Sequence, residues 1–334
     1  MIQFLMKLPS WILIRLSGKK QIEIRGRKLH PPFQFLLKLT ENQIPNIENL
    51  SHEDLRSAFK EQSKLSSKIP SNIKWKDHQL KVSDGSIKIR EYYSSSRSSG
   101  SALVYFHGGG FVIGNIETHH QVTSLLCNHL DSKIFSVEYR LSPENKYPIP
   151  LEDSCNAYEW VIKNSEYLEI KKNEVSVGGD SCGGNIAAHI CLKRRKENRS
   201  APKAQLLLYP WVNLNIESNS IEELKDGFSL TKPILEWFRF HYLNNISEAS
   251  SPDVSPILNQ DLSSLPPSVI CTAGFDPLRD EGNEFAQKLI EAGNKVTIKE
   301  YPGFIHLFAS MQFIPGVSLA LYEICSLFKE TTKD

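Results

Sequence analysis

The chain has 334 residues, of which 40% are hydrophobic and 23% are charged. These values fit one large globular domain with an insertion and exclude a disordered chain. The formal net charge is +1, and no apolar run reaches the roughly 18 residues of a membrane span, so neither nucleic acid nor stable membrane insertion is expected.

The first 75 residues are expected to be mostly helical and to form an N-terminal cap segment. Residues 1–16 are apolar but interrupted by Lys7, Pro9 and Arg15, and no small-residue cleavage site follows them. We therefore expect an amphipathic lid helix in contact with lipid or substrate rather than an exported leader. Further helices are expected over 33–39 and over 55–65, the second capped by Ser51 and Asp54.

Residues 76–334 are interpreted as one α/β catalytic domain, because short apolar strands alternate with helices. Strands are expected at 87–93, 102–106, 134–139, 174–177, 204–209, 269–273 and 296–301. Helices are expected at 118–130, 151–164, 185–198, 282–292 and 319–329. This order predicts a mainly parallel sheet covered on both faces, with its ligand site at the carboxyl ends of the strands. Residues 212–250 break the rhythm with an aromatic-rich insertion, which we interpret as a second part of the cap.

The strand 174–177 leads into Gly179-Asp180-Ser181-Cys182-Gly183 and then into a helix. A serine flanked by glycines two positions away on each side, between a strand and a helix, is typical of a nucleophile elbow. Larger side chains at the glycine positions would collide with the neighbouring strand and helix. The pattern predicts Ser181 as a nucleophile.

His107-Gly108-Gly109-Gly110 directly follows the strand 102–106. Acyl transfer needs hydrogen-bond donors for the oxyanion that forms on the substrate, and bare glycine backbone can approach it closely. We predict that the N–H groups of Gly108 and Gly109, together with that of Cys182, are these donors. His107 and Gly110 are expected to shape the loop.

Asp276 and His306 each follow one of the last two predicted strands. The chain order serine, aspartate, histidine is the order of α/β-hydrolase triads. His306 is therefore predicted as the general base and Asp276 as the carboxylate that orients it. Asp280 lies further from its strand, and we expect it to be an ordinary residue at a helix N-terminus.

On these motifs the chain resembles the hormone-sensitive-lipase family of α/β-hydrolases. The matching stretches are YFHGGGFVIGN (105–115), VEYRLSPENKYPIPLED (137–153), VGGDSCGGNIAAH (177–189), DPLRDEG (276–282), YPGFIHLF (301–308) and, at the cap entry, RGRKLHPPFQFLLKLTE (25–41). The resemblance implies carboxylesterase or lipase activity on acyl esters, no cofactor, and a cap of N-terminal helices plus a mid-chain insertion. No metal site is expected either, since no HExxH occurs and His119-His120 lack metal-ligand spacing.

Two positions depart from the family pattern: Cys182 stands where alanine is usual, and Leu307 stands where bacterial members usually have glycine. We expect the Cys182 thiol beside the nucleophile to make the enzyme sensitive to bulky thiol reagents. We expect Leu307 to shift the His306 loop and to narrow the pocket.

The expected activity is hydrolysis of short- to medium-chain acyl esters through an acyl-enzyme, with a small-molecule ester as the partner. Three alternatives are an amidase or arylformamidase on the same triad, a non-catalytic receptor for hydrophobic small molecules, and a lipid-surface binding module led by residues 1–16. The six cysteines lack CxxC spacing and indicate free thiols in a reducing, cytoplasmic compartment. By analogy, a homodimer would form through the edge strand near Val296.

Overall fold

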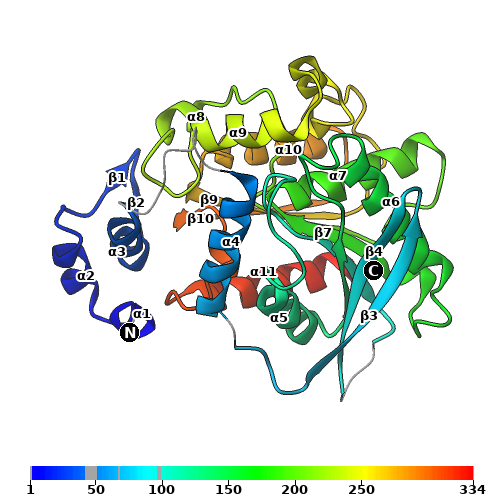
Figure 1. Ribbon diagram of the computed structural model, residues 1–334, viewed down its shortest axis with the longest axis horizontal. Coiled ribbons are helices and arrows are strands. Elements are labelled where there is room, and N and C mark those ends of the chain that lie inside the picture. The colour runs from blue at the N-terminus through cyan, green and yellow to red at the C-terminus, as the bar shows by residue number, and fades with distance from the viewer. Residues whose placement is uncertain (1, 42–50, 67, 96–98, 334) are drawn as a thin grey trace.

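The computed structural model describes residues 2–41, 51–66, 68–95 and 99–333. Its centre is an eight-stranded sheet with the strand order β10-β9-β8-β7-β5-β6-β4-β3 (Figure 1). The strands are β3 (Ile73–Val82), β4 (Gly85–Ser94), β5 (Ala102–Phe106), β6 (Lys133–Glu138), β7 (Val175–Asp180), β8 (Gln205–Leu208), β9 (Ser268–Phe275) and β10 (Val296–Ile305). Pairing is antiparallel between β3 and β4 and between β4 and β6, and parallel from β6 to β10. The predicted mainly parallel sheet is confirmed.

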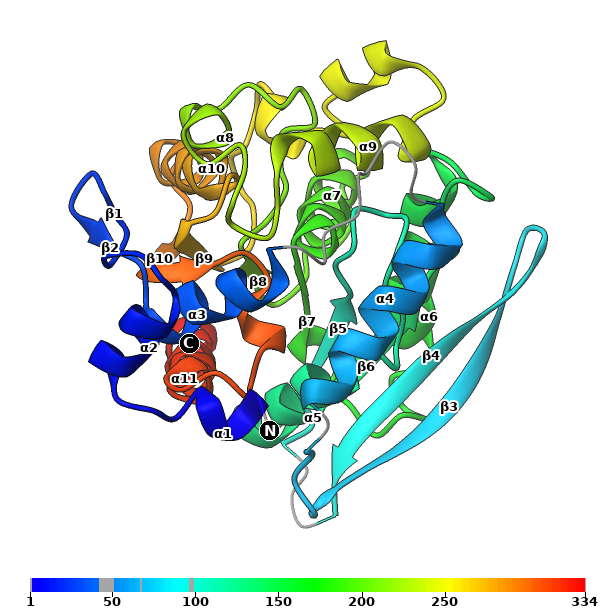
Figure 2. The ribbon, with the colours of Figure 1, turned by 60° about the vertical axis from the view of Figure 1, so that its left-hand side comes forward.

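Helices cover both faces of this sheet (Figures 1 and 2). They are α5 (His120–Leu130), α6 (Ile149–Lys163), α7 (Cys182–Lys196), α10 (Arg279–Glu291) and α11 (Val317–Thr332). The side chains of β5 alternate between two buried cores: Val104 and Phe106 join the core with α6, α7 and α10, whereas Leu103 and Tyr105 join the core with α5 and α11. Successive side chains of a strand point to opposite faces of the sheet, and both faces are buried here. Every residue of β5 is therefore apolar.

The segment before the sheet folds into short elements. They are α1 (Ile2–Leu5), α2 (Ser10–Leu16), β1 (Glu23–Ile24), β2 (Arg27–Lys28), α3 (Pro31–Thr40) and α4 (His52–Ser63). The predicted cap of α4 is present, because Ser51 Oγ accepts a hydrogen bond from the Asp54 N–H at 3.1 Å. The insertion carries α8 (Asn219–Glu223), α9 (Lys232–Tyr242) and a 3-10 helix, Ile246–Ser250.

The β1–β2 hairpin and the edge strand β3 were not among the predicted elements. The hairpin β1–β2 turns at Arg25 and Gly26, which both have positive φ, and each of its strands has only two residues. Strand β3 lies at the sheet edge, and Ile73 is the only one of its ten residues that is buried. A strand that is exposed along most of its length lacks the apolar alternation on which a sequence prediction depends.

Residues of α4 and α9 contact the loop that follows β5, next to the candidate site. In α4, Arg56 donates a hydrogen bond from Nε to the Val112 carbonyl, in the loop after β5, at 2.8 Å. In α9, the Phe238 ring packs directly against Gly110. Among the residues that the structure describes, no helix combines the length and the apolar character needed to cross a bilayer.

Candidate active site

Ser181 occupies a sharp turn between β7, which ends at Asp180, and α7, which begins at Cys182. Its backbone has φ 54° and ψ −121°, a strained conformation for a residue with a side chain. A Cβ on Gly179 would lie 2.4 Å from the Phe106 carbonyl oxygen, and one on Gly183 would lie 1.9 Å from the same atom. The glycines flanking the serine are therefore required by close backbone contacts, as the sequence predicted.

The structure brings the three predicted triad residues together. Asp276 directly follows the end of β9, and His306 directly follows the end of β10. His306 Nδ1 lies 2.7 Å from Asp276 Oδ2, and His306 Nε2 lies 3.0 Å from Ser181 Oγ. In this arrangement, Nδ1–H donates to the carboxylate and Nε2 is free to accept the serine proton. All three residues are buried, with Ser181 6% exposed.

Asp280 does not take part in this chain of hydrogen bonds. It lies in the first turn of α10, where it accepts a hydrogen bond from Arg279 Nε at 2.8 Å. Asp276 Oδ1 instead accepts from the Leu278 N–H at 2.9 Å, which fixes its carboxylate. The preference for Asp276 over Asp280 therefore agrees with the observed contacts.

The role predicted for Gly108 does not agree with its contacts. The Gly108 N–H already donates to Asp180 Oδ1 at 3.0 Å and so points away from any ligand. Gly109 and Gly110 have positive φ values of 120° and 59°. Within the described ranges neither N–H donates to a backbone carbonyl, and the Gly110 N–H interacts with the Cys182 thiol. Cys182 is the first residue of α7, so its N–H lacks an intrahelical acceptor.

Asp180 is a site residue that the sequence analysis missed. It is fully buried, and its carboxylate also accepts a hydrogen bond from the Tyr105 hydroxyl at 2.6 Å. His119 Nε2 lies 3.4 Å from Asp180 Oδ2. Burial opposes ionisation, but His119 and the hydrogen bonds outweigh it and lower the Asp180 pKa. The position inside the elbow motif was the only available signal, since its partners lie far away in the chain.

His107 is buried and faces the backbone rather than Ser181. Its Nδ1–H donates to the Gly108 carbonyl at 2.8 Å, and its ring stacks on Tyr139 with centroids 4.3 Å apart. Burial lowers its pKa to about 3, so the imidazole is neutral. These contacts are those of a residue that shapes the loop.

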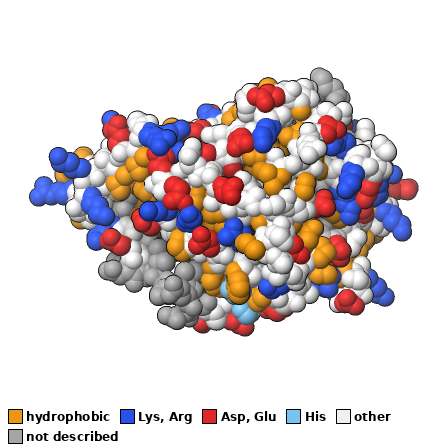
Figure 3. Space-filling view, turned by 90° about the horizontal axis from the view of Figure 1, so that it is seen from above, with side chains coloured by type: hydrophobic (Ala, Val, Ile, Leu, Met, Phe, Trp, Pro, Cys, Tyr) orange, Lys and Arg blue, Asp and Glu red, His pale blue; other side chains and the backbone are white. Residues whose placement is uncertain are grey.

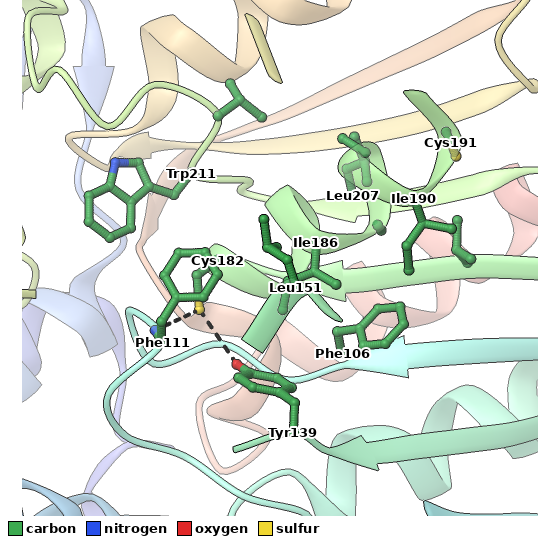
Figure 4. Packing of buried hydrophobic residues seen from close by; sticks show 14 of the residues in the cluster. Phe106, Phe111, Tyr139, Leu151, Cys182, Ile186, Ile190, Cys191, Leu207 and Trp211 are labelled. Carbon is green, nitrogen blue, oxygen red and sulfur yellow. Dashed lines mark hydrogen bonds between the residues drawn. The ribbon is translucent and has the colours of Figure 1, made fainter. Parts of the chain in front are cut away.

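The Cys182 sulfur lies in the buried hydrophobic cluster, near Phe111 and Tyr139 (Figure 4). It accepts a hydrogen bond from the Phe111 N–H at 3.2 Å and lies 3.7 Å from the Tyr139 hydroxyl. The side chain is 0% exposed, and burial raises its pKa to about 12. The expected sensitivity of this thiol to bulky reagents is therefore not supported, because the reactive thiolate is neither accessible nor populated. All six cysteines are free, as predicted.

Leu307 adopts the left-handed conformation, with φ 62° and ψ 14°. This explains why glycine is usual at the position, since a side chain there costs roughly 1–2 kcal/mol. His306 lies within hydrogen-bond distance of Ser181 with this residue in place, so the Leu307 side chain is compatible with that contact.

Aromatic residues form a wall around the elbow and the glycine loop. The backbone N–H of Trp211 donates a hydrogen bond to the Ser181 carbonyl at 3.0 Å. Phe111 and Tyr242 stack with centroids 3.8 Å apart. A Cβ on Gly110 would lie 2.2 Å from Phe238 Cγ, so this ring leaves no space beside the loop. The wall joins residues after β5, after β8 and from α9.

Comparison with known proteins agrees with this geometry. A family model described as the alpha/beta hydrolase fold matches residues 103–310. The chain belongs to the α/β-hydrolase fold family. Its relatives place it in the hormone-sensitive-lipase-like branch, as the motifs predicted.

Relatives of this α/β-hydrolase include carboxylic ester hydrolase LipN from Mycobacterium tuberculosis, 32% identical over 91% of this chain and 83% of LipN. An esterase structure from Pyrobaculum calidifontis has 34% identity and a TM-score of 0.86, covering 90% of this chain and 98% of that one. The structure of the carboxylesterase EstE1, from a metagenomic library, has 34% identity and a TM-score of 0.81. The match covers 85% of this chain and 99% of the EstE1 chain. The protein is a carboxylic-ester hydrolase.

Proposed function

We propose that Ser181 attacks the ester carbonyl while His306 Nε2 takes its proton and Asp276 holds the imidazolium. The acyl group passes to Ser181, the alcohol leaves with the proton from His306, and water then releases the acid. The observation that carries this proposal is the chain of short contacts from Asp276 through His306 to Ser181.

For the oxyanion we propose the N–H groups of Gly109, Gly110 and Cys182. Gly110 replaces Gly108 in this set because the Gly108 N–H is used by Asp180. The N-terminus of α7 adds its partial positive charge at the same place. The donors are backbone groups on a braced loop, so they need no rearrangement as charge develops on the substrate.

Turnover of a p-nitrophenyl ester tests the triad. Ser181→Ala and His306→Ala should each lower kcat by at least about 10⁴-fold, because the members of a triad act as one unit. Asp276→Asn should also lower kcat, since it permits the wrong tautomer of His306. Ser318→Ala, on the exposed side of α11, should behave as the wild type. Wild-type turnover by Ser181→Ala would refute the assignment.

For the substrate we propose esters with short to medium acyl chains. The closely packed aromatic wall around Gly110 supports a pocket of limited depth. The names of two relatives point the same way: an arylesterase from Saccharolobus solfataricus, 32% identical over 70% of this chain, and an ethyl acetate hydrolase from Pseudomonas putida, 29% identical over 85%. A p-nitrophenyl ester series should give the highest kcat/KM at short to medium length, and a maximum at long chains would contradict the proposal.

The relatives named above are ester hydrolases, and the amidase and receptor alternatives gain no support from them. Paired ester and anilide substrates test the amidase alternative directly. We expect the ester to be cleaved much faster.

We further propose that residues 1–75 and 212–250 form the cap over residues 76–334, and that the protein is cytoplasmic. The contacts of α4 and α9 with the glycine loop support the first statement. The six free cysteines support the second. The position of β10 at the edge of the sheet is compatible with a homodimer formed through this strand, although β2 lies beside part of it. Analytical ultracentrifugation of the wild type tests whether the protein is a dimer.

A further inference from the structure

The two N-terminal helices expose large apolar side chains that a surface helix would normally bury. In α2, five of the seven residues are large and apolar, but only Leu13 is buried. Trp11 is 66% exposed and Leu16 is 50% exposed, and in α1 Phe4 is 75% exposed. A helix that is apolar all round is normally enclosed by protein or lipid. These exposed side chains are therefore a candidate surface for contact with another molecule.

The exposed residues of α2 lie on one side of the helix. At 100° per residue, the exposed Trp11, Arg15 and Leu16 fall within one arc together with the half-buried Ile12, and the buried Leu13 and Ser17 fall on the other side. The buried side packs against α3, so α2 is held in place by its inner face. We call the exposed set of Phe4, Trp11 and Leu16 the N-terminal apolar face.

The charge around this face identifies its occupant. Residues 1–41 contain eight Lys and Arg against two Glu, a net charge of +6, in a chain whose total is +1. Lys7, Arg15 and Lys20 are exposed and make no ion pair with any residue in the described ranges. Figure 3 shows Lys and Arg side chains at the left-hand end, with Asp and Glu side chains among them.

A second copy of the chain fits this face poorly, because a symmetric contact would bring two net positive surfaces together. An anionic bilayer surface fits both features. Tryptophan and phenylalanine insert at the level of the lipid headgroups, and basic side chains interact with anionic lipids. We propose that the N-terminal apolar face docks the protein on the surface of an anionic lipid bilayer without spanning it.

Co-sedimentation with vesicles tests the proposal on the full chain. Vesicles containing a third phosphatidylglycerol in phosphatidylcholine should bind the wild type, and added salt should weaken the binding. Phosphatidylcholine vesicles should bind it at least about 10-fold more weakly, since they attract no basic residues. Equal binding to both lipids, or no binding to either, would overturn the proposal.

Variants separate the face from the rest of the surface. Phe4→Ser/Trp11→Ser should weaken binding by on the order of 10-fold or more, since it removes the inserting side chains. Lys7→Ser/Lys20→Ser should weaken it to a similar degree, and only on anionic vesicles. Phe240→Ser is the matched control, because Phe240 is 73% exposed but lies in α9, and it should bind as the wild type.

Circular dichroism spectra and the midpoint of urea unfolding should be unchanged in all these variants, which shows that each is folded. Sedimentation without lipid tests the other occupant. If the wild type is a dimer, Phe4→Ser/Trp11→Ser is a monomer and vesicles bind neither, then a second copy covers the face and the proposal fails. Because binding is measured without catalysis, this failure is distinct from failure of the proposed triad.

Discussion

At the scale of single residues, Asp180 connects the nucleophile elbow with the glycine loop. Its buried carboxylate accepts hydrogen bonds from the Gly108 N–H and the Tyr105 hydroxyl. One acidic side chain therefore fixes the peptide that precedes the proposed oxyanion donors. This explains how Gly109 and Gly110 are directed toward the site.

Replacing Asp180 should affect both stability and turnover. Asp180→Ala leaves two buried donors without an acceptor, at roughly 1–3 kcal/mol each, and should also lower kcat because the loop loses its brace. Tyr105→Phe removes one donor and keeps the Gly108 contact, so it should cost only about 1 kcal/mol and leave kcat nearly unchanged. Urea unfolding and ester kinetics measure the two effects; equal loss of kcat in both variants would contradict this role.

Cys182 should be chemically inert in the folded protein. The thiol is fully buried and its pKa is raised to about 12, so an aromatic disulfide reagent should neither modify it nor inhibit turnover. Cys182→Ala should keep kcat within a few-fold, because the backbone N–H remains, but should lose about 1–3 kcal/mol as the Phe111 N–H loses its acceptor. Inhibition that rises in step with modification of Cys182, followed by mass spectrometry, would refute this.

The contacts among the three residues of the proposed triad were predictable from the sequence, because each residue follows a strand end and strand ends are visible as apolar runs. The direction of a single N–H was not predictable. For Gly108 it depends on a contact with Asp180, which lies in a different strand–turn unit. The burial of the Cys182 thiol likewise depends on Phe111 and Tyr139, which the fold supplies from elsewhere.

At the scale of elements, α4 contacts the core through the apolar side chains of Leu55 and Phe59 and is tied to the loops after β5 and β6 by Arg56. Its guanidinium binds both Glu144 oxygens, at 2.7 and 2.8 Å, and also reaches the carbonyls of Val112 and Ser142. Since Glu144 is half-exposed, the ion pair itself adds little to global stability. Its effect is to fix the position of a cap helix.

Arg56→Gln should therefore loosen α4 more than it destabilises the protein. We expect faster limited proteolysis within residues 51–66 and a change in the free energy of unfolding of under about 1 kcal/mol. Arg195→Gln, which breaks an exposed ion pair with Asp261, serves as the control and should leave the proteolysis unchanged. If Arg56→Gln resisted proteolysis within residues 51–66 as well as the wild type does, the anchoring role of Arg56 would be contradicted.

The same contact should survive mild acid. Hydrogen bonding to Arg56 lowers the Glu144 pKa to about 2, although burial opposes the shift. A carboxylate whose pKa is lowered in the folded state stabilises the fold fully at pH values above its ordinary pKa of 4.5. This stabilisation is lost progressively as the pH falls from there toward about 2. Proteolysis at pH 5 should therefore match that at neutral pH.

The sequence predicted the strands of the sheet interior well but missed β3 at one edge. Strands β5 to β9 are buried along nearly their whole length and read as apolar runs, whereas β3 has one buried residue of ten. Helix α7 was expected to begin at residue 185 but begins at Cys182. Glycines disfavour a helix locally, and here close packing of the elbow overrides that preference.

At the scale of the whole molecule, two buried neutral histidines should make the fold sensitive to acid. Burial lowers the pKa of His107 to about 3 and that of His189 to about 4. In the unfolded chain both return to about 6.5, so between that pH and about 4 the unfolded state binds more protons and stability falls as pH falls. Each histidine contributes about 1.4 kcal/mol per pH unit in this range.

Denaturant unfolding at pH 7 and pH 5 measures this effect. His189→Gln should reduce the loss of stability between the two pH values by the share of one histidine, because glutamine does not titrate. An unchanged pH dependence in the variant would show that His189 is not held neutral by the fold.

The parallel strands β7, β9 and β10 place Ser181, Asp276 and His306 together at their carboxyl ends, although the three residues come from separate segments of the chain. Covalent labelling tests their joint role most directly. A fluorophosphonate should modify Ser181 alone, as located by mass spectrometry of the peptide that carries it. The label should be absent from Ser181→Ala and strongly slowed in His306→Ala. Stoichiometric labelling of another residue, or labelling that persists in Ser181→Ala, would contradict the assignment of the nucleophile.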